Sequence, residues 1–145
     1  MESVHFIVGI GVLATNAVAG IWGAAAWLRN RPSVGFWYAL RTAQVAVVLQ
    51  AGLGVTLLAL GHVAPDDLHV IYGVAPIVVS FSAEAIRSGV AERELTGLDF
   101  DALPADRRRA IAAVIVRRET GIMAASALVV LFLALRAAAT SGVLF

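Results

Sequence analysis

The sequence predicts an all-α membrane protein: a single domain of residues 1–145 with a four-transmembrane-helix bundle and one additional cytoplasmic or interfacial helix. Three observations support this prediction. The 145 residues are 60% hydrophobic and 14% charged, whereas a soluble domain is about half apolar and a quarter charged. Long uncharged runs recur along the chain, and the basic residues, all arginine, gather on one side of these runs. The lack of cysteine excludes disulfides, thiolate metal sites and iron–sulfur clusters.

The first span is expected at residues 4–28, because no charged side chain lies between Ser3 and Leu28. At about 1.5 Å per residue, this helix is longer than the roughly 30 Å of hydrocarbon that it must cross. A cleaved signal peptide is the alternative, since Ala17-Val18-Ala19 resembles a cleavage site. We prefer a membrane anchor, because the first residues carry no positive charge and the apolar run is too long for a signal peptide.

Two further spans follow, each introduced by a turn. Asn30-Arg31-Pro32-Ser33 ends the first helix and leads to a second span at residues 36–61. Arg41 falls inside this span, and its long side chain is expected to reach the near membrane surface. Pro65-Asp66-Asp67 then supplies the turn and the N-cap of a third span at residues 68–87.

The connection at residues 88–119 is the part of the chain that resembles a soluble protein. Leu103-Pro104-Ala105-Asp106 predicts a helix start, and the clusters Arg107–Arg109 and Arg117–Arg118 flank an apolar stretch. This pattern is typical of a helix at the headgroup boundary that continues into a fourth span at residues 120–140. A solvated extension of the fourth span explains the pattern equally well. The two arginine clusters are expected to bind anionic lipid head groups, with enforcement of topology as the alternative.

The arginines also predict the orientation of the chain. All of them except Arg136 fall beside the first and third connections. Since short basic loops stay in the cytoplasm, both termini are expected on the extracytoplasmic side of the cell (inner) membrane. A composition rich in Arg, Ala and Val, without Lys, favours a bacterial origin. Four aromatic residues are expected to form a belt near the cytoplasmic interface: Trp22, Trp27, Trp37 and Tyr38.

The three histidines, His5, His62 and His69, fall at the extracytoplasmic ends of three different helices. Imidazole binds iron, zinc or copper, titrates near neutral pH and is costly to bury without a partner. The alternative is a separate local role for each histidine at a chain terminus or a helix end. Helical spacing places each histidine on a face with small or polar residues, which is expected to point into the bundle. These faces are His5, Gly9, Val12, Asn16, Gly20 and Gly23; Gln44, Val48, Ala51, Val55, Leu58 and His62; and His69, Tyr72, Pro76, Ser80, Ala83 and Arg87.

The histidines define two overlapping candidate sites. A b-type haem needs two facing neutral imidazoles and a cation near its propionates, whereas imidazoles with nearby carboxylates suit Zn²⁺, Ni²⁺ or Cu²⁺. A quinone or lipid pocket that uses His69 or Tyr72 as a hydrogen-bonding group is a third version. The candidate cofactor ligands are His5, His62, His69, Tyr72 and Arg136, and the candidate metal ligands are His5, His62, His69, Asp66 and Asp67.

With these ligands, the architecture resembles small membrane cytochromes of the b561 type in its helix count and its candidate histidines. The resemblance implies a haem held between histidines of a four-helix core. Such cytochromes usually have paired histidines at both membrane depths, whereas the cytoplasmic half of this chain has no histidine. The resemblance therefore does not extend to an electron relay across the membrane.

Other features suggest other functions. Glu84, Arg87 and Arg41 are predicted to form an ion pair that closes the cytoplasmic end of the bundle, with a transporter gate as the alternative. No GxSxG, HExxH, P-loop or GxGxxG motif lies in a supporting context, so we expect a protein without catalytic activity or a haem-binding electron-transfer protein. The alternatives are an accessory or scaffold subunit of a larger membrane complex, a homo-oligomer, or a small transporter or channel; nucleic acid is not expected as a partner. A channel would be lined by Asn16, Gln44, Gln50 and Ser80.

Overall fold

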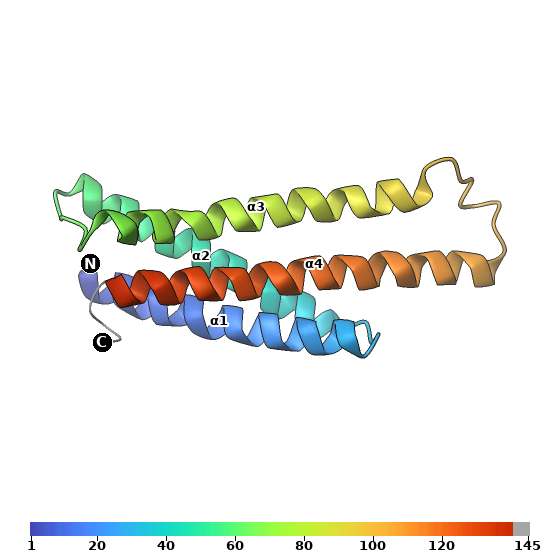
Figure 1. Ribbon diagram of the computed structural model, residues 1–145, viewed down its shortest axis with the longest axis horizontal. Helices are drawn as coiled ribbons and strands as arrows, with labels where there is room; N and C mark the ends of the chain where they lie inside the picture. The colour runs from blue at the N-terminus through green and yellow to red at the C-terminus, as the bar shows by residue number, and fades with distance from the viewer. Residues whose placement is uncertain (141–145) are drawn as a thin grey trace.

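The computed structural model describes residues 1–140, and these form four α-helices (Figure 1). Each helix is long and apolar enough to cross a membrane. The predicted all-helical class with four spans is confirmed at this level, and it indicates a multi-pass membrane protein. The helices are α1 (Glu2–Leu28), α2 (Val34–Ala59), α3 (Asp67–Leu95) and α4 (Ala105–Thr140).

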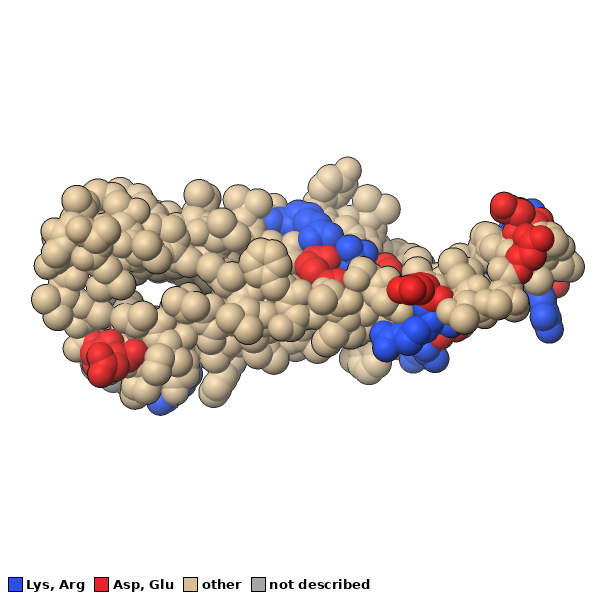
Figure 2. Space-filling view, turned by 90° about the horizontal axis from the view of Figure 1, so that it is seen from above, with Lys and Arg blue, Asp and Glu red and all other residues tan. Residues whose placement is uncertain are grey.

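The outward surface of the four helices is apolar, as a lipid-facing surface must be. Large aliphatic and aromatic side chains on all four helices are more than half exposed, and such a surface would be unstable in water. Charged side chains gather toward one half of the face seen in Figure 2. Examples of the exposed apolar residues are Ile7, Ile21, Val78, Phe81 and Phe132.

The helix ends follow the turn signals of the sequence. Asn30 adopts a φ of +51°, a left-handed conformation that Asn tolerates, and the chain leaves α1 there. Ser33 caps α2, because its hydroxyl accepts a hydrogen bond from the backbone N–H of Phe36 at 3.3 Å. Asp66 caps α3 in the same way, because its carboxylate accepts from the backbone N–H of His69 at 2.6 Å. The predicted N-cap of the third span is therefore confirmed.

The additional helix expected within residues 88–119 is not a separate element. Instead, α3 continues to Leu95, and α4 runs from Ala105 to Thr140 without a break. The helix start predicted at residues 103–106 is confirmed, but the segment that follows it is the first part of α4. The physical reason is that residues 106–120 contain neither Gly nor Pro, so nothing in them ends a helix.

The packing of the helices is uneven. α4 packs along both α1 and α3, and α1 packs along α2, whereas α2 and α3 make a much smaller contact. Figure 1 shows α4 between α1 and α3, with α2 on the far side. We call the end that carries residues 60–66 and the start of α1 the histidine end. The opposite end, with residues 29–33 and 96–104, is the arginine end, and there α3 and α4 extend beyond the other two helices (Figure 1).

The core is built from small residues of α1 against α2 and α4. The predicted inward face of α1 is confirmed over its central part, where Val12, Asn16, Gly20 and Gly23 are buried. A Cβ atom on Gly23 would lie 2.4 Å from Cε2 of Phe36, so only glycine allows this approach. Asn16 donates to the carbonyl of Val12 at 2.9 Å, so its amide stays on its own helix.

Candidate functional site

Two of the three histidines lie together at the histidine end. The rings of His5 on α1 and His69 on α3 have their centroids 6.3 Å apart and their planes inclined by 53°. His62 is not part of this pair, because its Nδ1 lies 3.0 Å from a carboxylate oxygen of Glu2 in an exposed contact.

The face that helical spacing assigned to the inside of the second span is wrong, because Val48, Val55 and Leu58 on it are exposed, whereas Val47 and Leu57 are buried. His62 also lies beyond the helix, because α2 ends at Ala59. Gly61, with a φ of +87°, then turns the chain out of the helix.

Hydrogen bonds fix the tautomer of His69. Its Nδ1 lies 3.0 Å from the carbonyl oxygen of Ala137 and 3.3 Å from the hydroxyl oxygen of Thr140. The Thr140 hydroxyl already donates its hydrogen to the same carbonyl, so both groups can only accept from the imidazole. Nδ1 of His69 therefore carries a proton, and in the neutral ring Nε2 keeps its lone pair. Metal-bound histidines are commonly oriented in this way, by donation from the other ring nitrogen to a carbonyl.

His5 is held by Gln50 of α2. The amide nitrogen of Gln50 lies 3.1 Å from Nε2 of His5. Nδ1 of His5 and the amide oxygen of Gln50 are buried and have no hydrogen-bond partner within residues 1–140. If the amide rotates by half a turn, its oxygen accepts from Nε2 of His5, and Nδ1 then has a lone pair. In either arrangement the His5–Gln50 pair retains an unsatisfied buried group, which a ligand could complete.

Gly9 lies close to this pair. A Cβ atom on Gly9 would lie 3.1 Å from the amide nitrogen of Gln50, which is tight, whereas one on Gly54 would make an ordinary contact, 3.4 Å from Cε1 of His5. Figure 2 shows the molecule hollowed at this end, near the connection between α2 and α3. α2 and α3 make only a small contact with each other, which agrees with this opening. The unsatisfied atoms of His5 and Gln50 are themselves buried.

The other predicted site residues have different surroundings. The guanidinium of Arg136 on α4 lies over the ring of Tyr72 on α3, 5.7 Å from its centroid. This cation–π contact holds the two side chains together. Asp66 caps α3, and Asp67 is in the first turn of α3. Within residues 1–140, no three His, Asp or Glu side chains are grouped so that they could hold a metal ion.

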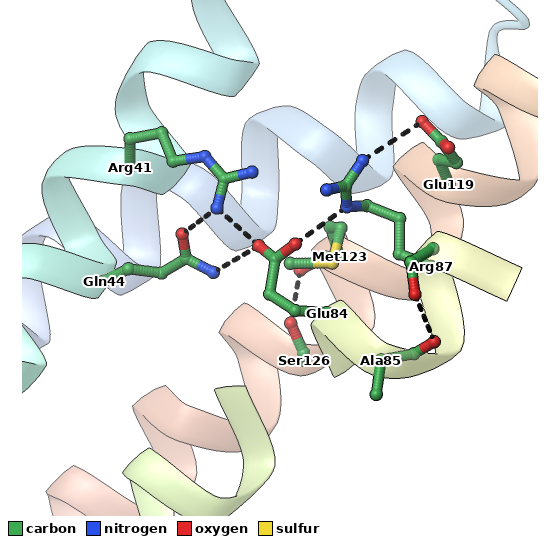
Figure 3. Close-up of polar contacts among 9 residues, drawn as sticks. Arg41, Gln44, Glu84, Ala85, Arg87, Glu119, Met123 and Ser126 are labelled. Carbon is green, nitrogen blue, oxygen red and sulfur yellow. Dashed lines mark hydrogen bonds and ion pairs between the residues drawn. The ribbon is translucent and has the colours of Figure 1, made fainter. Parts of the chain in front are cut away.

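A second polar cluster lies toward the arginine end, around Glu84 of α3 (Figure 3). Its carboxylate accepts hydrogen bonds from Arg41, from the amide of Gln44 at 2.9 Å and from Nε of Arg87 at 2.9 Å. Arg87 also lies 3.7 Å from the carboxylate of Glu119 on α4. The cluster thus ties α2, α3 and α4 together, as the sequence predicted for Glu84, Arg41 and Arg87.

Two members of this cluster were not predicted from the sequence. Gln44 is three residues after Arg41, so helical spacing could have identified it. Glu119 is the last residue of the predicted connection at residues 88–119, in the part that is expected to be helical and to continue into the fourth span. A groove of about 230 Å³ lies next to the cluster between α2 and α3. Its lining is Arg41, Gln44, Val47, Val48, Ile77, Ser80, Phe81 and Glu84.

The fold defines the general class of this chain. Four long apolar helices indicate a multi-pass helical membrane protein, in which two polar clusters lie toward opposite ends of the helices. Comparison with known protein families, with curated proteins and with solved structures finds no match to the chain.

Proposed function

We propose that this protein binds a ligand within the membrane at the histidine end, and that a b-type haem held by His5 and His69 is the specific form of this function. The observation that supports the proposal is the state of the two rings. The Nδ1–H of His69 is bound to a carbonyl, which leaves Nε2 with a lone pair, and Nδ1 of His5 is buried without a partner. Each imidazole therefore retains one nitrogen that no hydrogen bond within residues 1–140 engages. With the Gln50 amide turned so that its oxygen accepts from Nε2 of His5, Nδ1 of His5 has the lone pair that iron requires.

The two rings lie close enough for one ligand to contact both. The centroids of His5 and His69 are 6.3 Å apart. Bound haem would supply reversible one-electron chemistry. The chain itself would orient His69 through Ala137 and Thr140, and would orient His5 through Gln50.

The absorption spectrum of the detergent-purified protein tests this proposal. In protein from cells supplied with a haem precursor, we expect a Soret band and sharp α and β bands after reduction with dithionite. His5→Ala and His69→Ala should each remove these bands, while gel filtration shows that both variants remain folded. His62→Ala is the matched control, because His62 lies at the same end but pairs with Glu2. A colourless protein, or equal bleaching by His62→Ala, would overturn the haem proposal.

A quinone is the second candidate ligand, and Gln50 is the specific reason. The amide oxygen of Gln50 is buried without a partner, and the hydroxyl of a quinol would donate to it. Quinone that is extracted together with the native protein, and is lost on Gln50→Leu, would support this version. Protein that retains neither haem nor quinone would contradict both versions.

We also propose that the histidine end faces the extracytoplasmic side of the cell membrane. The positive-inside rule supports this orientation, because the arginines other than Arg136 lie toward the opposite end. The chain has no cysteine, so single introduced cysteines report accessibility without background. Val63→Cys, at a position that is 93% exposed, should react with an impermeant maleimide on intact cells. Ala102→Cys should react only after permeabilisation, and the reverse pattern would contradict the orientation.

A further inference from the structure

A second groove lies at the arginine end, between the last turn of α1 and the first half of α4. Its volume is about 290 Å³, and it is larger than the groove between α2 and α3. Most of its wall is apolar, and arginines contribute to its border. The lining residues are Ala26, Trp27, Asn30, Arg31, Pro32, Ala113, Val114, Val116, Arg117 and Thr120.

The wall of this groove is held in place by Trp27. A Cβ atom on Gly121 of α4 would lie 2.8 Å from Nε1 of Trp27, so the indole packs closely against the backbone of α4. The guanidinium of Arg117 lies 5.9 Å from the centroid of the Trp27 ring. This contact holds the positive charge of Arg117 beside the groove. The aromatic surface and the cation are thus arranged before any ligand binds.

The two arginines of the groove have no acidic partner in the described part of the chain. The ion pairs of residues 1–140 engage Arg41, Arg87 and Arg118, and none engages Arg31 or Arg117. Arg118 is the informative comparison, because it is adjacent to Arg117 and pairs with Glu94. Two cations at the border of an apolar groove attract a ligand that combines an anionic head with an apolar body.

The position of the groove identifies this ligand. α1 ends at Leu28, so the groove lies where the first span leaves the apolar layer, and there the phosphates of a bilayer meet its acyl chains. We propose that this groove binds one anionic phospholipid. Its phosphate lies between Arg31 and Arg117, and the upper part of an acyl chain lies against Trp27, Val114 and Val116. Free phosphate shares the head-group chemistry but lacks the apolar part, so it should bind much more weakly.

Native mass spectrometry of the detergent-purified protein tests this proposal. We expect phosphatidylglycerol to bind at least about fivefold more tightly than phosphatidylcholine with the same acyl chains. Arg31→Gln combined with Arg117→Gln should remove most of this preference. Inorganic phosphate at millimolar concentration should not displace the lipid.

The matched control is Arg107→Gln combined with Arg109→Gln. This control also removes two positive charges. Both charges lie on α4, outside the groove and about 12–15 Å along the helix from Arg117. The Arg107–Arg109 cluster was also expected to attract anionic lipid, but it lines no part of this groove, so its loss should weaken only diffuse attraction and change the lipid preference by no more than about twofold. Equal losses in the two double variants would indicate diffuse attraction to a basic surface, and they would overturn the proposal. Equal binding of the two lipids, or displacement by inorganic phosphate, would also overturn it. Circular dichroism confirms that both variants are folded.

Discussion

Gly23→Ala should destabilise the protein by about 2–3 kcal/mol, because the new methyl group has no space between the helices. Its Cβ would lie 2.4 Å from Cε2 of Phe36 and 2.8 Å from Cβ of Ala124. Phe36 is fully buried, so its ring cannot turn away, and Ala124 has no flexible side chain to move. The helices α1, α2 and α4 must therefore separate. Unfolding in mixed micelles with an increasing fraction of dodecyl sulfate measures this change.

The control is Gly11→Ala on the same helix. A Cβ atom on Gly11 has no neighbour within 4 Å among residues 1–140, so this change tests helix propensity without a clash. We expect its unfolding midpoint to stay unchanged or to rise slightly, because alanine favours a helix over glycine. If the two variants unfold at the same fraction of dodecyl sulfate, the close approach at Gly23 does not contribute to stability.

These two glycines show what the sequence can predict about packing. Helical spacing assigned Gly23 to the inward face of the first span, and that face is confirmed by its burial. The spacing could not predict that its neighbours would be Phe36 and Ala124, because the relative rotation of three helices decides this contact. The sequence also predicted the start of α4 near Ala105. It did not show whether the helix would continue, because interfacial and extended helices share one pattern of arginines and apolar residues.

The candidate site was predictable to a similar extent. The position of a histidine near each helix end was sufficient to predict that His5 and His69 lie at the same depth. The grouping of His62 with them depended on a helix that continues to residue 62, and Gly61 prevents this. Gln50 was predicted as a polar residue of the second span, but its contact with His5 depends on how α1 and α2 are rotated about their axes. Sequence spacing within one helix contains no information about that rotation.

Glu84→Ala should have the largest effect among the charged residues, with a loss of about 2–4 kcal/mol and separation of α2 from α3. The carboxylate of Glu84 accepts from Arg41, Gln44 and Arg87, and without it two guanidinium groups face each other at the edge of the apolar region. α2 and α3 make little other contact, so this cluster is a large share of what joins them. Unfolding in mixed micelles measures the stability, and spin labels on introduced cysteines in α2 and α3 measure their separation.

Glu94→Ala is the matched control for Glu84→Ala, because the two side chains are equally exposed, at 26%. Glu94 pairs with Arg118 alone and lies beyond the apolar span of α3, where water screens the pair. Its loss should cost less than about 1 kcal/mol and leave the separation of α2 and α3 unchanged.

Replacing Arg41 and Glu84 together by leucine should restore part of the stability that Glu84→Ala removes. In the double variant neither the Glu84 carboxylate nor the Arg41 cation remains, and Arg87 still pairs with Glu119. Equal effects of Glu84→Ala and Glu94→Ala would mean that the cluster is an ordinary surface ion pair.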